Sequence, residues 1–188
     1  VLANNPMFIG DSEIQYQIGI LYGKLQDYER QSYHLSRVAQ DSSNYSESQK
    51  ILKRNEKIVS LVEDARNSLR NGDTDKSIDA LRSIISLDSE NLSARLMLIK
   101  LLARENKKMQ LIEELDALTS LPHKLLDDED IYEIGSIYAK LKLNDKAKTY
   151  LNRITTDSSY YADAKKVMAS LDLAETSTEK PSKEQVQK

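Results

Sequence analysis

The sequence contains no cysteine, no tryptophan, one phenylalanine, five glycines and three prolines in 188 residues. Without cysteine the chain can form no disulfide, thiol nucleophile or cysteine-based metal site, and this absence suits a reducing cytosol and a cell envelope equally. The shortage of glycine and proline, together with 30% charged residues, disfavours an all-β fold and favours a helical protein with a solvated exterior. Because tryptophan is absent and phenylalanine occurs once, the core must consist of Leu, Ile, Val, Ala and Tyr.

The charge and hydropathy of the chain exclude further classes of ligand. The formal net charge of −3 is too small to indicate binding to nucleic acid or to a membrane surface. No apolar run approaches the roughly 18 residues that a membrane-spanning helix needs, so direct membrane insertion is not expected. No signal peptide or lipidation motif begins the sequence, although its first residue is Val1 rather than Met. We therefore expect a fragment or a processed form, with room for a targeting segment upstream; cytoplasmic and periplasmic locations both remain open.

One eight-residue pattern occurs twice. Residues 18–25 and residues 134–141 both place glycine second, tyrosine fifth and lysine seventh. The turn-forming residues 41–45 recur in the same way at residues 157–161. An internal repeat of this kind is typical of helical solenoids and related arrays.

Helical periodicity continues from Ser12 to Leu173. Apolar residues at helical spacing, separated by short polar turns, predict antiparallel helix pairs. The expected helices cover residues 12–25 and 28–40, 45–71 and 74–87, 92–103 and 108–119, and 130–141 and 145–155. These pairs form repeats over residues 12–44, 45–91, 92–127 and 128–160, followed by a capping helix over 161–173. Residues 1–11 are expected to be a lead-in or the remnant of a preceding repeat, and residues 174–188 a disordered tail.

The first helix of the second repeat is anomalous. No glycine or proline occurs between Tyr45 and Asn71, and the apolar seam is continuous, which predicts a single helix of about 25 residues. Its early turns extend beyond the reach of the preceding helix, so part of their apolar face should be exposed and mark an interface. We expect this second interface to meet either residues 7–9 or a partner chain, and it comprises Ile51, Leu52, Ile58 and Val59.

The two outer repeats resemble the tetratricopeptide repeat family. The family's glycine and tyrosine on the first helix are matched by Gly19 and Tyr22, and again by Gly135 and Tyr138. Residues of the family's second helix are matched by Leu35, Val38, Ala147, Leu151 and Ile154. In the inner repeats Ala65 and Ile99 stand at the glycine place, so looser or differently angled helix crossings are expected there.

The resemblance implies an all-α fold: a right-handed superhelical solenoid of antiparallel helix pairs, with about four repeats plus a C-terminal capping helix. It also implies a groove whose inner wall is one face of each first helix. The cationic wall positions are Lys24, Arg66, Arg70, Lys100, Arg104 and Lys140, and the apolar or aromatic ones are Tyr16, Ile20, Val62, Leu96 and Tyr132. A cationic rail beside an apolar strip favours a peptide that carries acidic residues.

Residues suited to catalysis are scarce. We expect His34 and His123 to be solvated, and no phosphate-binding glycine loop, paired-histidine metal spacing or Gly-x-Ser-x-Gly turn is present. The acidic run at residues 127–130 lacks the spacing of a calcium loop and stands where a helix begins, a place that favours carboxylates. The sequence thus predicts a non-enzymatic protein without cofactor or metal.

Three functions remain compatible with these patterns. The first is a protein–protein interaction scaffold or adaptor that binds a peptide or partner protein in the groove. The second is a structural subunit that self-assembles into a homo-oligomer or packs into a larger complex. The third is the repeat region of a larger protein whose active part lies outside this chain.

Overall fold

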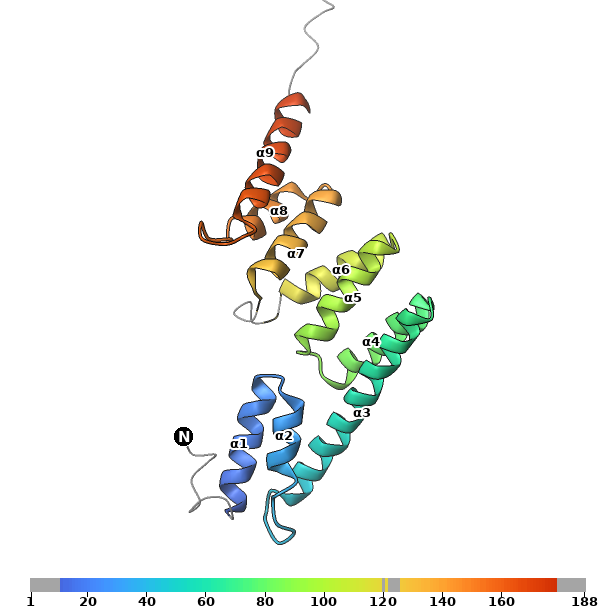
Figure 1. Ribbon diagram of the computed structural model, residues 1–188, viewed down its shortest axis with the longest axis vertical. Helices are drawn as coiled ribbons and strands as arrows, with labels where there is room; N and C mark the ends of the chain where they lie inside the picture. The colour runs from blue at the N-terminus through green and yellow to red at the C-terminus, as the bar shows by residue number, and fades with distance from the viewer. Residues whose placement is uncertain (1–10, 120, 122–125, 179–188) are drawn as a thin grey trace, which may run out of the picture. The chain divides into compact units, whose positions relative to one another are not determined.

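The computed structural model describes residues 11–119, 121 and 126–178, and within these residues the chain forms nine α-helices and no strand (Figure 1). The helices are α1 (Ser12–Lys24), α2 (Tyr28–Leu35), α3 (Tyr45–Arg70), α4 (Thr74–Leu87), α5 (Leu92–Arg104), α6 (Lys108–Thr119), α7 (Asp128–Lys140), α8 (Asn144–Leu151) and α9 (Tyr161–Thr178). The chain divides into two compact units, Val1–Leu101 (unit 1) and Leu102–Lys188 (unit 2). Residues 1–10 of the expected lead-in, His123 and the tail beyond residue 178 lie outside the described residues.

Aspartates begin several of these helices. Asp11, Asp27, Asp73 and Asp127 are N-caps whose carboxylates accept hydrogen bonds from backbone N–H groups two or three residues later. These N–H groups have no partner within the helix, so a capping carboxylate stabilises the first turn and fixes where it begins. Asp127 is followed by Asp128, Glu129 and Asp130 in the first turn of α7, so the acidic run begins a helix.

The turn inside each helix pair has one geometry. Gln26, Gly72, Asn106 and Lys142 all have positive φ angles between 55° and 77°. The next residue in each turn donates its backbone N–H to a carbonyl five residues back, as in the bond from Asp27 to Tyr22 and its counterpart from Leu143 to Tyr138. This left-handed C-terminal motif satisfies the last carbonyls of the first helix and reverses the chain.

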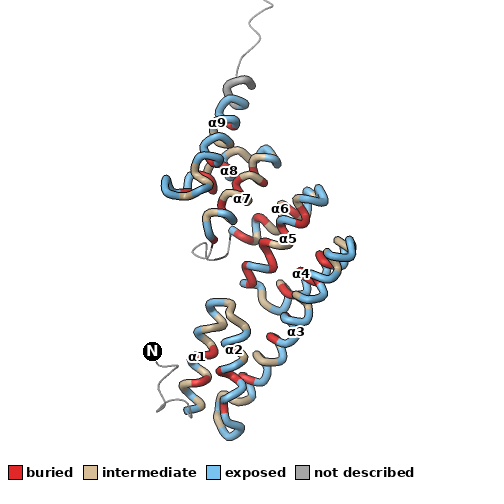
Figure 2. The backbone as a smooth tube through the Cα atoms, in the orientation of Figure 1, coloured by how far each residue is buried: buried red, intermediate tan, exposed pale blue. Residues whose placement is uncertain are grey.

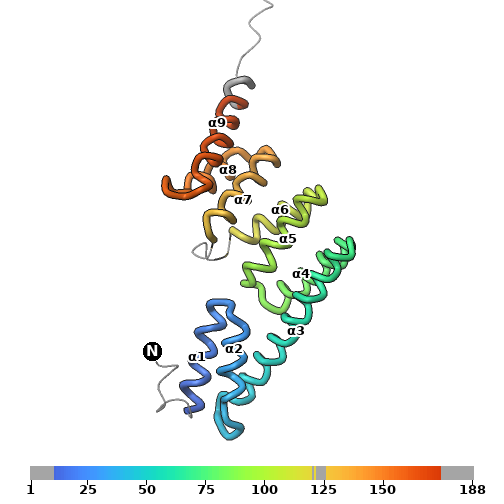
Figure 3. The backbone as a smooth tube through the Cα atoms, in the orientation of Figure 1, coloured from blue at the N-terminus to red at the C-terminus, as the bar shows by residue number. Residues whose placement is uncertain are grey.

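Unit 1 is organised around α3, which has 26 residues. The hairpin of α1 and α2 lies beside the first half of α3, and α4 lies beside its second half (Figures 1 and 3). Asn55 of α3 is buried and donates its amide to Gln31 Oε1 at 2.9 Å and to Ser32 Oγ at 3.1 Å, which attaches α2 to α3. The expected length of this helix agrees with the structure.

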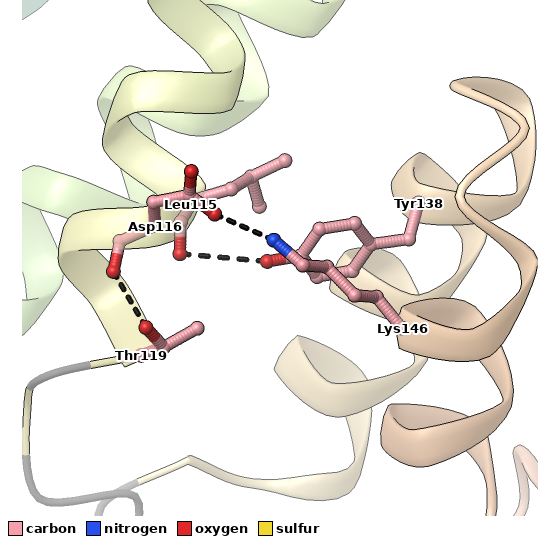
Figure 4. A network of polar contacts seen from close by, with 5 residues as sticks. All are labelled: Leu115, Asp116, Thr119, Tyr138 and Lys146. Atoms are coloured by element: carbon pink, nitrogen blue, oxygen red, sulfur yellow. Dashed lines mark hydrogen bonds and ion pairs between the residues drawn. The ribbon is translucent and has the colours of Figure 1, made fainter.

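Unit 2 is built from α6 to α9. Gly135 of α7 faces Leu151 of α8, and a Cβ added at Gly135 would lie 2.6 Å from Leu151 Cγ, so glycine allows the two helices to approach. The hydroxyl of buried Tyr138 donates to the carbonyl of Leu115 at 3.4 Å, and Lys146 Nζ lies 2.7 Å from Asp116 Oδ1, which together join α6 to α7 and α8 (Figure 4). Helix α9 packs on α7 and α8.

Buried residues, most of them apolar, occur in every described helix (Figure 2). Leu81, Ile84, Leu96, Leu102 and Leu115 are all buried. The expectation that His34 is solvated was wrong, because its side chain is only 6% exposed. Its Nδ1 lies 2.9 Å from Gln15 Oε1 and its ring stacks on Tyr22, and burial followed by the charge of Arg37 lowers the pKa of His34.

Three expected helix ends differ from the structure. Helix α2 ends at Leu35 and α8 at Leu151, each earlier than expected. In the residues that follow, backbone N–H groups donate hydrogen bonds to carbonyls three residues back, so the chain leaves the α-helical conformation. Val38 and Ile154 nevertheless remain buried. Helix α9 continues to Thr178, past the expected start of the tail at residue 174, since no proline or glycine interrupts it there.

Candidate partner-binding site

The cationic positions of the expected groove are exposed. This holds for Lys24, Arg66, Arg70 and Lys100 in unit 1 and for Arg104 and Lys140 in unit 2. Within the described residues Lys24, Arg66 and Lys140 form no ion pair, whereas Arg104 Nε lies 3.2 Å from Glu105 and Arg70 donates to Asn67 Oδ1 at 3.3 Å. Arg66 is thus a cation available to a ligand on α3.

The apolar positions of the expected groove are less uniform. Tyr16, Ile20, Val62 and Tyr132 are half-buried, but Leu96 is 8% exposed and belongs to the core, which corrects its assignment to the groove wall. Tyr132 stacks on Tyr160 with ring centroids 5.4 Å apart, so one face of its ring is already covered.

A cavity of about 480 Å³ lies beside the middle of α3, within unit 1. Its lining comes from four helices and two turns. Helix α2 supplies Tyr28, α3 supplies Ile58, Val59, Ser60, Val62, Glu63, Ala65 and Arg66, α4 supplies Leu81 and Ile84, α5 supplies Ser93, Ala94 and Met97, and the turns supply Gln26 and Asn91. The wall is mainly apolar with a few polar groups at its edge, which is the usual composition of a binding cavity.

The length of α3 explains this cavity. With 26 residues, α3 is long enough for two separate contacts, with α2 on its first half and α4 on its second half. The face between these two contacts, around Val59 and Val62, is left hollow.

One end of the cavity is formed by a contact that we name the clasp, in which Gln26 of the first turn and Tyr28 at the start of α2 meet residues 88–92, which connect α4 to the start of α5. The hydroxyl of Tyr28 donates to Asp88 Oδ2 at 2.6 Å and accepts from Asn91 Nδ2 at 2.8 Å. Gln26 donates to the carbonyl of Glu90 and accepts from the N–H of Leu92. Burial, then hydrogen bonding to Asp88, raises the pKa of Tyr28, so this hydroxyl remains a donor.

The residues of the expected second interface differ in how far they are exposed. Ile58 is only 1% exposed and Ile51 and Leu52 are half-buried, because α2 covers the early turns of α3. Val59 is 61% exposed. Ile58 and Val59 line the cavity together with Val62 and Arg66 from the expected groove, so residues of two separately predicted surfaces line the same cavity. The expected contact with residues 7–9 lies outside the described residues.

Sequence reasoning missed the clasp, Tyr28 and Asn91 included. The hydrogen bonds of Tyr28 to Asp88 and Asn91 join residues 60 and 63 positions apart, and neither periodicity nor a motif connects them. Among the described residues no group of three or more His, Cys, Asp or Glu side chains could hold a metal ion. No described helix combines the length and the apolar character that crossing a membrane requires.

Comparison with known proteins identifies similar repeats and folds. Residues 131–156 match the sequence model of the tetratricopeptide repeat. A search of curated proteins found no match. The chain is similar in structure to the P58(IPK) TPR domain, with a TM-score of 0.72 and 18% identity over 91% of this chain. It is also similar to MamA protein, with a TM-score of 0.54 and 15% identity over 88% of this chain and 82% of that one.

The match to the P58(IPK) domain covers 49% of that chain, so the present chain spans about half of its length. Identities this low show the fold. The α7–α8 pair is therefore a tetratricopeptide repeat, and the chain has the all-α solenoid fold of tetratricopeptide-repeat domains.

Proposed function

We propose that the chain is a non-catalytic scaffold that binds a peptide segment of a partner protein on the groove face of α3. Tetratricopeptide-repeat folds generally serve protein–protein interaction, and this supports the broad assignment. The cavity supports the more specific assignment of a peptide site on α3. Two residues of the expected groove, Val62 and Arg66, line it together with the exposed apolar residue Val59.

The charge of this face favours an acidic segment. Arg66 and Arg70 lie one helical turn apart and are exposed, and Arg66 forms no ion pair within the described part of the chain. A carboxylate placed against such a pair gains charge-assisted hydrogen bonds and is attracted from a distance at low salt. Because the attraction crosses exposed groups, it should weaken as the ionic strength rises.

The test uses a library of random peptides displayed on phage and selected on the full chain. We expect selected peptides to combine apolar residues with Asp or Glu, and to lose at least about tenfold in affinity for the variant R66E/R70E. The matched control is K53E/K57E, which has the same charge change and spacing on the same helix but places the charges on the opposite face.

Two results contradict this proposal. If the selected peptides contain no acidic residues, the proposed preference for an acidic segment is wrong. Equal affinities of the two charge-reversal variants would show that the face bearing Arg66 is not the site, and a mass in solution that grows with concentration would then favour self-assembly.

A further inference from the structure

The cavity beside α3 is larger than one side chain can fill. A cavity of about 150 Å³ lined by apolar residues is known to hold one benzene molecule. The cavity here measures about 480 Å³, so it has room for more than one bulky apolar group. Its floor is Ile58, Ala65, Leu81 and Ile84, all buried, and these side chains offer no hydrogen bond to water that enters. Displacing that water by apolar groups is favourable.

The edge of the cavity carries a single cation. Arg66 lines it, is exposed and forms no ion pair within the described residues. Glu63 lies one turn before Arg66 on the same edge and would repel a carboxylate placed beside it. An acidic group is therefore favoured on the side of Arg66 that leads toward Arg70, where the exposed face of α3 continues.

The clasp makes its part of the cavity lining polar. Tyr28, Asp88 and Asn91 are hydrogen-bonded to one another, and the pKa of Tyr28 is raised, so its hydroxyl stays neutral. A ligand thus meets an apolar floor, hydrogen-bonded polar groups at the clasp and a cation at Arg66.

Resting on the proposed scaffold function, we propose that this cavity receives two bulky apolar side chains of the partner peptide, with a carboxylate of the same peptide against Arg66. The cavity and the groove face share Val62 and Arg66, so a peptide along α3 reaches both. The peptide's apolar pair provides affinity by burial, and its carboxylate fixes the direction in which it lies.

The first test fills the cavity from its open side. Val62→Trp places an indole where the peptide's side chains would lie, and because Val62 is half-buried the substitution does not force the core apart. We expect the selected peptides to bind V62W at least about tenfold more weakly than the original chain. Leu21→Trp is the control, since Leu21 is exposed on α1 and does not line the cavity, and its effect should stay within about twofold.

Folding of V62W is checked by circular dichroism and its melting temperature. If V62W does not fold, Val59→Trp replaces it, because Val59 is exposed and lines the same cavity. The second test swaps charge: a peptide whose acidic residue is changed to Lys should bind R66E better than it binds the original chain. A peptide that shows no such preference does not place its carboxylate against Arg66.

The outcomes separate this proposal from the scaffold function. Peptides that bind V62W and V59W at full affinity but fail to bind R66E/R70E would overturn the cavity proposal and leave the scaffold function standing. Dodecanoate is tested in parallel as a free apolar carboxylate. If V62W blocks its binding and no peptide is selected, the cavity serves a small ligand and both proposals are wrong.

Discussion

At Gly135 the backbone of α7 and the side chain of Leu151 on α8 occupy adjoining space. An added Cβ would lie 2.6 Å from Leu151 Cγ, and Gly19 stands in the same relation to Leu35, with 2.6 Å to Leu35 Cδ2. Both leucines are buried and cannot swing into solvent. The glycines of the repeated pattern therefore determine how closely the two helices of a pair approach.

This contact predicts the sign of a glycine substitution. In an open helix Gly→Ala would stabilise by about 1 kcal/mol through helix propensity. In Gly135→Ala we expect a net loss of about 1–3 kcal/mol, because overpacking against Leu151 outweighs propensity. Urea unfolding measures the change.

Leu151→Ala supplies the control for this prediction. Alone it should lower the free energy of unfolding by about 2–5 kcal/mol, because it leaves a cavity. Adding Gly135→Ala to it should then cost little, since the opposing side chain is gone. A more stable G135A single variant would mean that α7 and α8 can move apart.

At the scale of elements, α3 has two faces that differ sharply between adjacent residues. Ile58 is 1% exposed and packed in the core, whereas Val59 is 61% exposed at the mouth of the cavity. We expect Ile58→Ala to lower the free energy of unfolding by about 2–5 kcal/mol. Val59→Ala should change it by less than about 0.5 kcal/mol, as surface substitutions usually do.

Denaturant unfolding of both variants tests this difference, and each serves as the control of the other because they share one helix. A similar loss in both would mean that Val59 is covered in solution, by a second copy or by another part of the chain. Stability of V59A that depends on protein concentration would identify the second copy.

The length of α3 was predictable, but the surface it forms was not. Residues 45–70 contain no helix breaker and keep a continuous apolar seam, so local signals determine where this helix runs. The burial of Ile58 depends on α2, which Asn55 holds through Gln31 and Ser32. A contact between polar side chains cannot be inferred from the spacing of apolar residues. The sequence therefore predicted that this face of α3 is exposed.

The turns show the same division between local and distant information. Gly72 is a recognisable end of α3, because glycine adopts a positive φ without strain. Gln26, Asn106 and Lys142 also have a positive φ, although none of them is glycine. Their conformation follows from their place in the turn of a helix pair. The clasp depends in turn on Gln26 and Tyr28 meeting residues 88–92, so the cavity could not be predicted from the chain alone.

At the scale of the whole molecule, each of the two units contains a tyrosine whose hydroxyl is shielded from solvent. Burial, then the hydrogen bond to Asp88, raises the pKa of Tyr28 in unit 1. In unit 2, burial and the neighbouring Tyr150 and Asp116 raise the pKa of Tyr138. Above the ordinary tyrosine pKa of 10.0 the unfolded chain releases protons that the folded chain still holds.

Stability should therefore decrease as the pH rises above 10, by at most about 1.4 kcal/mol per pH unit for each of the two groups. Tyr28→Phe removes one of these groups, so its free energy of unfolding should decrease less steeply with pH than that of the original chain. At neutral pH the same variant should be less stable by about 1–3 kcal/mol, because Asp88 and Asn91 lose their shared partner. Urea unfolding between about pH 8 and pH 11 measures both effects.

Tyr33→Phe is the control, since it removes the hydroxyl of a tyrosine that is 57% exposed and lies outside the clasp. Tyr138→Phe extends the test to unit 2 and should reduce the alkaline loss there. If the two units unfold separately, Y28F alters only the transition that reports on α1 to α4, and Y138F only the one that reports on α7 and α8. An identical pH dependence in Y28F and the original chain would show that the Tyr28 hydroxyl is open to solvent, and the clasp could then not close the end of the cavity.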